Sequence, residues 1–210
     1  MIFYEPHARD RNLLPHDPFK ALISPRPVGW ISTVSPQGEV NLAPYSFFNA
    51  FSGAPPLVGF SSEGFKDSAS FAQESGEFVW NLASYDLRFE MNATSAPLPR
   101  GASEFEHAGL ATAPSKIVKA PRVAASPASL ECKVTQVVRL NDMTGAQTDR
   151  YLVLGQVVGV HLDEKYLRDG IMDITLMKPI ARCGYQDYAV VDKVFSVKRP
   201  AGAGNQSGGG

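Results

Sequence analysis

The sequence predicts a mainly β domain, a closed or partly closed antiparallel barrel with a few short helices. Three observations support this prediction. Short runs of β-branched and aromatic residues recur along the 210-residue chain, helical patterns are few and short, and an apolar fraction of 44% suffices for a core. Closure into a barrel removes the exposed sheet edges that so many strands would otherwise leave.

The expected strands follow one another at short intervals. Residues 28–34 (VGWISTV) are β-branched and aromatic, and the turn residues 35–38 (SPQG) lead into an extended run over residues 39–49, which predicts a hairpin. Further strands are expected at residues 57–61, 77–83, 130–140 and 151–162. The last segment, YLVLGQVVGVHL, has the apolar character of a central strand buried on both faces. Its Gly155 and Gly159 predict bulges or bends.

Helices are expected at four places. One begins at Asp67 or Ser68 and runs to about Ser75, with Gly76 after its end, and another covers residues 86–94 and stops before Pro97. Residues 103–106 (SEFE) fit a capping box, and residues 163–168 form a fourth candidate.

The chain is expected to form one domain with two appendages. Residues 1–20 form an N-terminal arm, residues 21–195 the barrel domain, and the Gly- and Ser-rich residues 196–210 a disordered tail. Within the domain, the Pro-rich residues 96–128 are expected to cross the barrel surface.

Composition excludes several classes of protein. A net charge of −1 and a pI near 6.4 argue against a nucleic-acid partner. No apolar run approaches the length of a membrane span, and the charged N-terminus lacks the apolar centre of a signal peptide. Cys132 and Cys183 have no CxxC spacing, which favours free thiols in a reduced cytoplasm, with a disulfide left open.

A cluster of hydroxyls and one cation stands between an expected strand and an expected helix. Ser61, Ser62 and Ser68 can donate hydrogen bonds, Lys66 adds a positive charge, and the amides at the helix start attract anions. This pattern fits a phosphate site, with Asp67 capping the helix or pairing with Lys66. An ordinary polar loop capped by Ser68 explains the same residues.

Two further stretches carry binding potential. Pro44 removes a ladder donor, so its strand lies at an edge or is bulged and can meet a planar ligand, although Tyr45, Phe47 and Phe48 also suit a core or a dimer contact. Arg26, between Pro25 and Pro27, either grips an anion or carbonyl or forms a surface salt bridge.

Known catalytic and metal motifs are missing from the sequence. No HxH, HExxH or Cys/His cluster appears, so no metal site is expected, and there is no P-loop, GxGxxG or GxSxG motif. His161 ends an apolar strand, where it could reach a barrel mouth or serve a structural role.

Taken together, several stretches resemble the flavin reductase-like family of FMN-binding split barrels. They include "LLPHDPFKALISPRPVGWIST", "GEVNLAPYSFFNAFSGAPPLVGFSS", "KDS", "GEFVWNLA", "MNATSAPLP" and "LGQVVGVH". The resemblance covers roughly residues 10 to 190. It implies a six-stranded antiparallel Greek-key split barrel and a homodimer with FMN in a groove beside the dimer interface, with FAD left open as the alternative cofactor.

The resemblance also implies a distribution of cofactor contacts. The flavin phosphate falls on Ser61, Ser62, Lys66 and Ser68, and Asp67 beside them is a further cofactor-binding residue. The ring lies along the strand that includes Tyr45, Ser46, Phe47, Phe48 and Asn49, and Arg26, Trp30, Ser32 and Thr33 flank the ring or its side chain. His161 and residues 182–188 fall on the nicotinamide side.

The function implied is transfer of a hydride or electrons from NAD(P)H to flavin or another acceptor, including a monooxygenase partner. The flavin carries the chemistry, so no side-chain base is required. Two alternatives stay open: a flavoredoxin-like electron carrier reduced by a partner protein, and a barrel that has lost its flavin.

Overall fold

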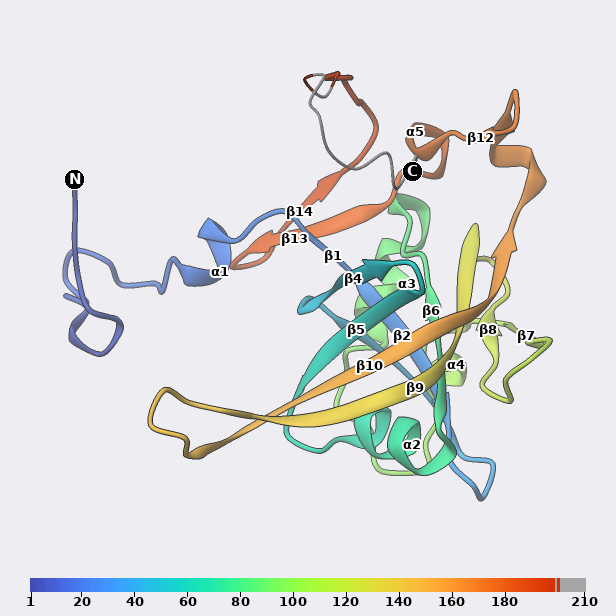
Figure 1. Ribbon diagram of the computed structural model, residues 1–210, viewed down its shortest axis with the longest axis horizontal. Helices are drawn as coiled ribbons and strands as arrows, with labels where there is room; N and C mark the ends of the chain where they lie inside the picture. Colours follow the sequence, from blue (N-terminus) through green and yellow to red (C-terminus); the bar gives the residue numbers. More distant parts are fainter. Residues whose placement is uncertain (199, 201–210) are drawn as a thin grey trace.

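The computed structural model describes residues 1–198 and residue 200, and antiparallel strands dominate it (Figure 1). The main sheet contains seven strands of the described chain in the order β3-β2-β6-β9-β10-β5-β4. In chain order they are β2 (Gly29–Val34), β3 (Val40–Tyr45), β4 (Phe48–Gly53), β5 (Pro56–Glu63), β6 (Glu77–Asn81), β9 (Ala128–Asn141) and β10 (Gln147–Leu162). The mainly β prediction is confirmed, although the six strands implied by the resemblance become seven.

The sheet curls so that its two edge strands are joined by a short corner. β3 and β4 end the sheet order but are separated in the chain only by Ser46 and Phe47, and the amide of Ser61 on β5 donates to the carbonyl of Phe47 at 2.8 Å. β2 pairs with β6 and β5 with β10, and these pairings between strands distant in the chain are those of Greek-key connections.

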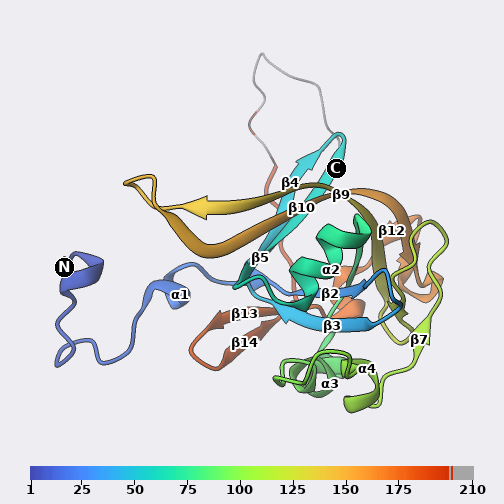
Figure 2. The same cartoon turned by 90° about the horizontal axis from the view of Figure 1, so that it is seen from below.

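Smaller elements surround the barrel. A second sheet has the order β1 (Arg26–Pro27), β13 (Ile180–Gly184), β14 (Asp187–Val190), and two short pairs join β7 (Thr112–Ala113) to β8 (Arg122–Val123) and β11 (Leu167–Arg168) to β12 (Ile171–Met172). The helical segments are η1 (Pro6–Ala8), α1 (Phe19–Leu22), α2 (Asp67–Ser75), η2 (Tyr85–Leu87), α3 (Arg88–Ala93), α4 (Glu104–His107), η3 (Glu164–Tyr166) and α5 (Ile174–Met177). Figure 2 shows α3 and α4 together beside β3.

Strand β2 supplies the centre of the core because both of its faces are covered. Successive side chains point to opposite sides of a strand. Trp30 therefore packs with Leu42, Met91 and Phe105 beneath α3 and α4. Ile31 packs on the other side with Phe60 and Phe78 beneath α2.

The central strand that is buried on both faces is β2, whereas the sequence predicted residues 151–162 for this position. β10 is mostly half-buried, and Val160 and Leu162 are 59% and 47% exposed. β9 and β10 also continue as a hairpin that projects from the body (Figure 1), where no second layer covers them. The predicted irregularities are confirmed, because the β9–β10 register shifts between Leu154 and Gly155 and again between Val157 and Gly159.

The run predicted over residues 39–49 divides into two strands. β3 pairs with β2 as the expected hairpin, and Pro44 lies on this edge strand as its missing amide requires. The chain then turns at Ser46 and Phe47, and β4 pairs with β5 instead.

The helix predictions are confirmed in part. α2 ends as expected at Gly76, whose φ of 72° is left-handed. The capping box does not form, because the Ser103 side chain makes no cap hydrogen bond at the start of α4. Residues 163–168 contain only the short turn η3, and Leu167 and Arg168 pair with β12.

The N-terminal residues before α1 extend away from the barrel in Figures 1 and 2. Most of the predicted tail, residues 196–210, lies outside the described residues. Among the described helices, none combines the length and apolar character that a membrane crossing needs.

Candidate functional site

Two cavities of about 480 Å³ each lie along strand β3 and share a wall. The first cavity lies between the β3–β4 corner, α3 and the β13–β14 sheet. The second cavity lies between β3, the start of α2 and residues 94–100. Because Pro44, Tyr45 and Ser95 line both, the two cavities form one groove.

Positively charged side chains line both cavities. Lys20, Arg26 and Arg182 line the first, and Lys66 and Arg100 line the second together with the first residues of α2. The first α2 amides with backbone partners are those of Ala69 and Ser70, which both bond to the Lys66 carbonyl, so the amides of Asp67 and Ser68 precede the helical ladder. Arg100 is 4.0 Å from the Asp67 carboxylate. This end of the groove therefore has the chemistry of an anion site.

A buried network fixes Tyr45 against the start of α2. Asn41 Nδ2 donates to Ser68 Oγ at 2.8 Å, and the Tyr45 hydroxyl is hydrogen-bonded to Ser68 and Ser62. Burial raises the pKa of Tyr45, although these hydrogen bonds oppose the effect. The Ser68 hydroxyl is thus engaged within the protein, so Ser68 presents mainly its backbone amide to a ligand.

Glu104 places a carboxyl group in the same cavity. Its Oε2 accepts a hydrogen bond from the Leu42 amide at 2.9 Å, which ties α4 to β3. Burial raises the pKa of Glu104, and the nearby Asp67 adds to the increase, although the hydrogen bonds from backbone amides lower it. Glu104 therefore keeps its proton to a higher pH than an exposed glutamate does.

The predicted serine cluster is not brought together as expected. Ser62 is fully buried and donates to the Gly64 carbonyl at 2.8 Å. Ser61 lies on the opposite face of β5, since adjacent strand residues alternate. Neither lines the second cavity, so the anion site retains Lys66 and Ser68 of the four predicted phosphate contacts, with Asp67 between them.

Three other predicted contacts are core residues. Trp30, Ser32 and Thr33 have no exposed surface. Trp30 Nε1 donates to Thr94 Oγ1 at 3.0 Å, and Ser32 Oγ donates to the Pro121 carbonyl at 2.5 Å. Since Thr94 lines the second cavity, Trp30 supports the groove from behind rather than facing it.

The remaining aromatic residues line a third cavity on the outer side of the β3–β4 corner. It has a volume of about 620 Å³, and its lining includes Ser46, Phe47, Phe48, Asn49 and Ser61. Tyr45 and Ser46 are therefore the residues of the predicted ring-binding strand that face the groove, while Phe47 and its neighbours face away from it.

Of the roles that the sequence left open, Arg26 grips carbonyl groups, and these belong to the backbone of the chain itself. It is 8% exposed, and its guanidinium donates to three backbone carbonyls, those of Lys20, Ile23 and Ser46. The side chain therefore braces the N-terminal segment against the β3–β4 corner. It reaches the first cavity only as part of this wall.

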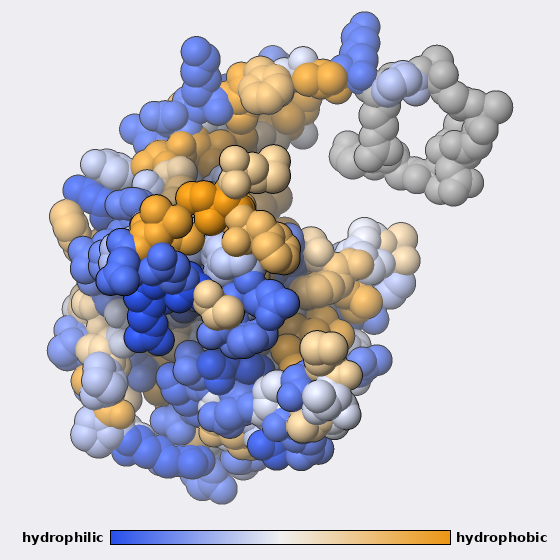
Figure 3. Space-filling model, turned by 90° about the vertical axis from the view of Figure 1, so that its left-hand side faces the viewer, coloured by the Kyte–Doolittle hydropathy of each residue, from blue (hydrophilic) through white to orange (hydrophobic). Residues whose placement is uncertain are grey.

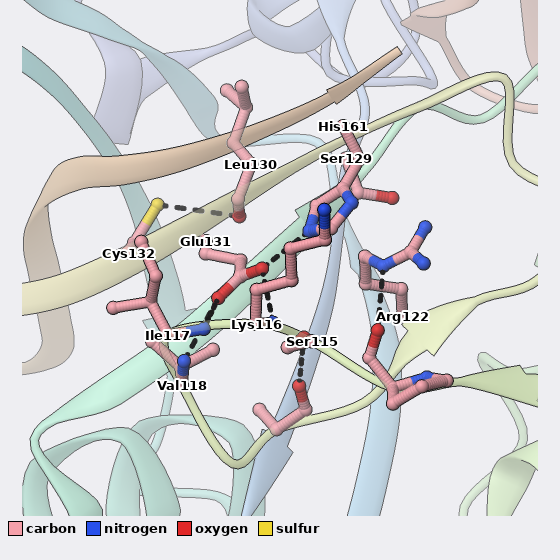
Figure 4. Close-up of polar contacts among 12 residues, drawn as sticks. Ser115, Lys116, Ile117, Val118, Arg122, Ser129, Leu130, Glu131, Cys132 and His161 are labelled. Atoms are coloured by element: carbon pink, nitrogen blue, oxygen red, sulfur yellow. Dashed lines mark hydrogen bonds and ion pairs between the residues drawn. The ribbon is translucent and has the colours of Figure 1, made fainter. Parts of the chain in front are cut away.

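His161 lies away from the groove, against a buried carboxylate (Figure 4). Glu131 has no exposed surface and accepts hydrogen bonds from the amides of Lys116, Ile117 and Val118 at 2.8, 2.6 and 2.9 Å. His161 Nε2 bonds to the same carboxylate. His161 thus helps to hold the loop between β7 and β8, which favours the structural role for this histidine.

Sequence reasoning missed several groove residues. Arg100 had no local signal, because it is a single arginine in a Pro-rich loop. Asn92 and Ser95 belong to the quoted stretch "MNATSAPLP" but were not singled out. Arg182 and Tyr188 of the expected late segment do line the first cavity, and the Arg182 guanidinium lies 4.6 Å from the Tyr188 ring centroid. No cluster of metal-binding side chains occurs among the described residues.

Comparison with known proteins decides the family. Residues 22–176 match the flavin reductase like domain. The chain belongs to this family. An uncharacterized protein of Halalkalibacterium halodurans is 36% identical, with 85% of this chain and 87% of the relative covered. The uncharacterized protein YwrF of Bacillus subtilis is 34% identical over 88% of this chain and 94% of the relative.

Solved structures of similar fold support the assignment. Nitrilotriacetate monooxygenase component B from Bacillus cereus has 29% identity and a TM-score of 0.85, with coverage of 94% of this chain and 98% of that one. Flavoredoxin of Desulfovibrio vulgaris shares the fold at 20% identity, with a TM-score of 0.74 and coverage of 84% and 92%. The split-barrel class and the resemblance to flavin reductases are therefore confirmed.

The groove meets the chemical demands of a flavin with a phosphate tail. One end combines helix amides with Lys66 and Arg100, which suits a dianion. The other end runs along an edge strand, whose outward backbone groups can bond the rim of a planar ring. Because Tyr45 lines both cavities, one ligand can extend along the groove from the phosphate end to the ring end.

Proposed function

We propose that this chain is a flavin-dependent oxidoreductase that binds FMN in the groove and passes electrons from NAD(P)H to free flavin or another acceptor. The observation that carries the proposal is the union of an anion site and a planar-ligand site in one groove, in a chain of the flavin reductase like family. When bound, FMN supplies the redox chemistry by taking a hydride from the nicotinamide and releasing electrons to the acceptor.

The chain's own residues bind and orient the cofactor in this proposal. Lys66, Arg100 and the amides of Asp67 and Ser68 hold the phosphate in the second cavity. Tyr45 keeps its position through Ser68 and Ser62 and lines the groove where the phosphate end meets the ring end. The ring lies in the first cavity between the β3–β4 corner and α3.

We further propose a homodimer and a monooxygenase or free flavin as the physiological acceptor. The first rests on exposed apolar residues around the third cavity, among them Leu22, Phe47 and Phe51. The second rests on the likeness to a protein described as a monooxygenase component. A cytoplasmic location fits a reductant such as NAD(P)H and two free cysteines, Cys132 and Cys183.

The phosphate assignment is tested with Lys66→Met. Loss of one charge-assisted contact should weaken the binding of FMN by about 1–3 kcal/mol, which is roughly 5- to 150-fold in Kd. Titration followed by flavin fluorescence measures this Kd. Riboflavin has no phosphate, so its affinity should not change. Lys193→Met removes an exposed lysine elsewhere and serves as the control. Equal FMN affinity in wild type and Lys66→Met would show that the phosphate lies elsewhere.

The reaction is tested by anaerobic mixing of the FMN-loaded protein with NADH and with NADPH. An oxidoreductase should lose its visible flavin absorbance rapidly with at least one of them. Slow bleaching with both would favour an electron carrier reduced by a partner protein. A colourless protein that takes up neither FMN nor FAD would favour a barrel that has lost its cofactor.

A further inference from the structure

A fourth, smaller cavity adjoins the first cavity on the side of α3. This α3 cavity has a volume of about 240 Å³ and lies between the η2–α3 segment and the β13–β14 sheet. Met91, Asn92 and Tyr188 line both it and the first cavity. A molecule in the α3 cavity would therefore be separated from the first cavity only by these side chains.

The lining of the α3 cavity is aromatic and aliphatic with one charge. Tyr85, Phe89 and Tyr188 contribute rings, and Ile180 and Val190 contribute branched side chains. Arg88 is the only charged residue among those that line it. Such a lining suits a flat apolar ligand that carries a single anionic group.

Arg88 is held in place at the rim of this cavity. Its Cζ lies 4.0 Å from the Tyr85 ring centroid and 4.2 Å from that of Phe89, and its Nη1 donates to the Tyr85 carbonyl at 2.7 Å. Among the described residues this is the only hydrogen bond of the Arg88 side chain, and the side chain forms no ion pair there. A guanidinium fixed by two aromatic faces retains donors with the fork geometry that a carboxylate matches.

Size narrows the ligand further. Cavities that hold drug-sized ligands measure roughly 300–1,000 Å³, so the α3 cavity has room for a single ring. The rings of Tyr85, Phe89 and Tyr188 each have an arginine over one face. Their other faces and edges favour an aromatic ring over a saturated one, because aromatic pairs gain from stacked or edge-on contact.

We propose that the α3 cavity binds a small aromatic monocarboxylate, with its carboxylate on Arg88 and its ring against Tyr188. The binding itself is independent of the flavin. The interpretation of this ligand as the electron acceptor rests on the proposed function, because only then does the shared wall place it beside a redox cofactor.

The test titrates the full chain with benzoate as the probe and measures the affinity by calorimetry. Wild type should bind benzoate at least about tenfold more tightly than benzamide, which has the same shape without the charge. Cyclohexanecarboxylate should also bind more weakly than benzoate. Absence of benzoate binding, or equal affinity for benzoate and benzamide, would overturn the proposal.

Variants assign the binding to this cavity. Arg88→Met should weaken the binding of benzoate by about tenfold or more. Arg88→Lys keeps the charge but loses the planar guanidinium that pairs with both carboxylate oxygens, so its effect should be intermediate. Arg139→Met is the matched control, because Arg139 also lies over a tyrosine ring, 5.6 Å from the centroid of Tyr151, and also donates to a backbone carbonyl. Unchanged benzoate binding in Arg88→Met would overturn the assignment.

Two further measurements separate the alternatives. FMN affinity should be the same in wild type and Arg88→Met, so a chain that fails to bind FMN but binds benzoate contradicts the proposed function and supports this site. Sedimentation of wild type and Arg88→Met should give the same mass. A change of oligomeric state in Arg88→Met would identify this face as a contact between copies of the chain and would overturn the proposal.

Discussion

At the scale of single residues, the buried Glu131 carboxylate accepts four hydrogen bonds. Burial raises the pKa of its carboxyl group, but the hydrogen bonds from Lys116, His161, Val118 and Ile117 outweigh burial and lower the pKa from 4.5 to about 2 (Figure 4). A carboxylate that loses its proton more easily in the folded state stabilises that state at neutral pH. The same hydrogen bonds join the loop between β7 and β8 to strand β9.

This pKa predicts how stability depends on pH. Between pH 4.5 and about 2 the unfolded chain takes up the proton first, so the contribution of Glu131 is complete above pH 4.5 and disappears as the pH falls toward 2. Glu131→Gln should lower the free energy of unfolding at pH 7 by about 3 kcal/mol and flatten its decline in this window. Urea unfolding at a series of pH values measures both effects. Glu164→Gln, at an exposed position, should match wild type, and a wild-type-like pH profile in Glu131→Gln contradicts the role.

At the scale of residues, the sequence predicted which residue types lie together better than it predicted which way each side chain points. The pairing of Lys66 with a helix start could be predicted, because both features are adjacent in the chain. The separation of Ser61 from Ser62 follows from strand alternation, but only once the strand is known to continue to Glu63. The burial of Arg26 could not be predicted, because its three carbonyl partners are brought together by the fold.

At the scale of elements, the glycines of β10 decide how closely the sheet can pack. A Cβ added to Gly155 would lie 2.5 Å from Phe78 Cε1 and 3.2 Å from the Cβ of Cys132, and both neighbours are fully buried. Gly155→Ala should therefore destabilise the fold by about 1–3 kcal/mol through overpacking, as measured by denaturant unfolding. Gly53→Ala, at a position with open space around it, should be near neutral. Equal stability of the two variants would show that Phe78 moves aside without cost.

The elements themselves were largely predictable from local pattern. Alternating and β-branched runs gave the strands, and Gly76 gave the end of α2. The break between β3 and β4 was missed because residues 39–49 are continuously strand-like, and only pairing with β5 shows that the chain turns at Ser46. The coverage of β2 on both faces was also missed, because it depends on which helices pack over it.

At the scale of the whole molecule, apolar surface remains uncovered. β4 is an edge strand, Phe47 and Phe51 are 45% and 55% exposed, and Leu22 beside them is 76% exposed. Figure 3 shows the left-hand side of the molecule in Figure 1, the side on which the N-terminal segment lies. Orange apolar groups are visible there among blue polar ones. An unpaired edge with exposed aromatic residues is a surface that proteins normally cover. Sequence pattern gives no information about what covers it, since strand periodicity does not distinguish a core face from an interface.

We expect a second copy of the chain to cover this surface, as the homodimer proposal requires. Phe51→Glu places a charge in the apolar patch, so it should convert a dimer into a monomer, because an unpaired charge in an interface is strongly unfavourable. Sedimentation velocity at micromolar concentration measures the mass. Ile171→Glu makes the same change at a position that is 72% exposed on β12 and should leave the mass unchanged. A monomeric wild type, or a dimeric Phe51→Glu with native circular dichroism, would refute the assignment of this face.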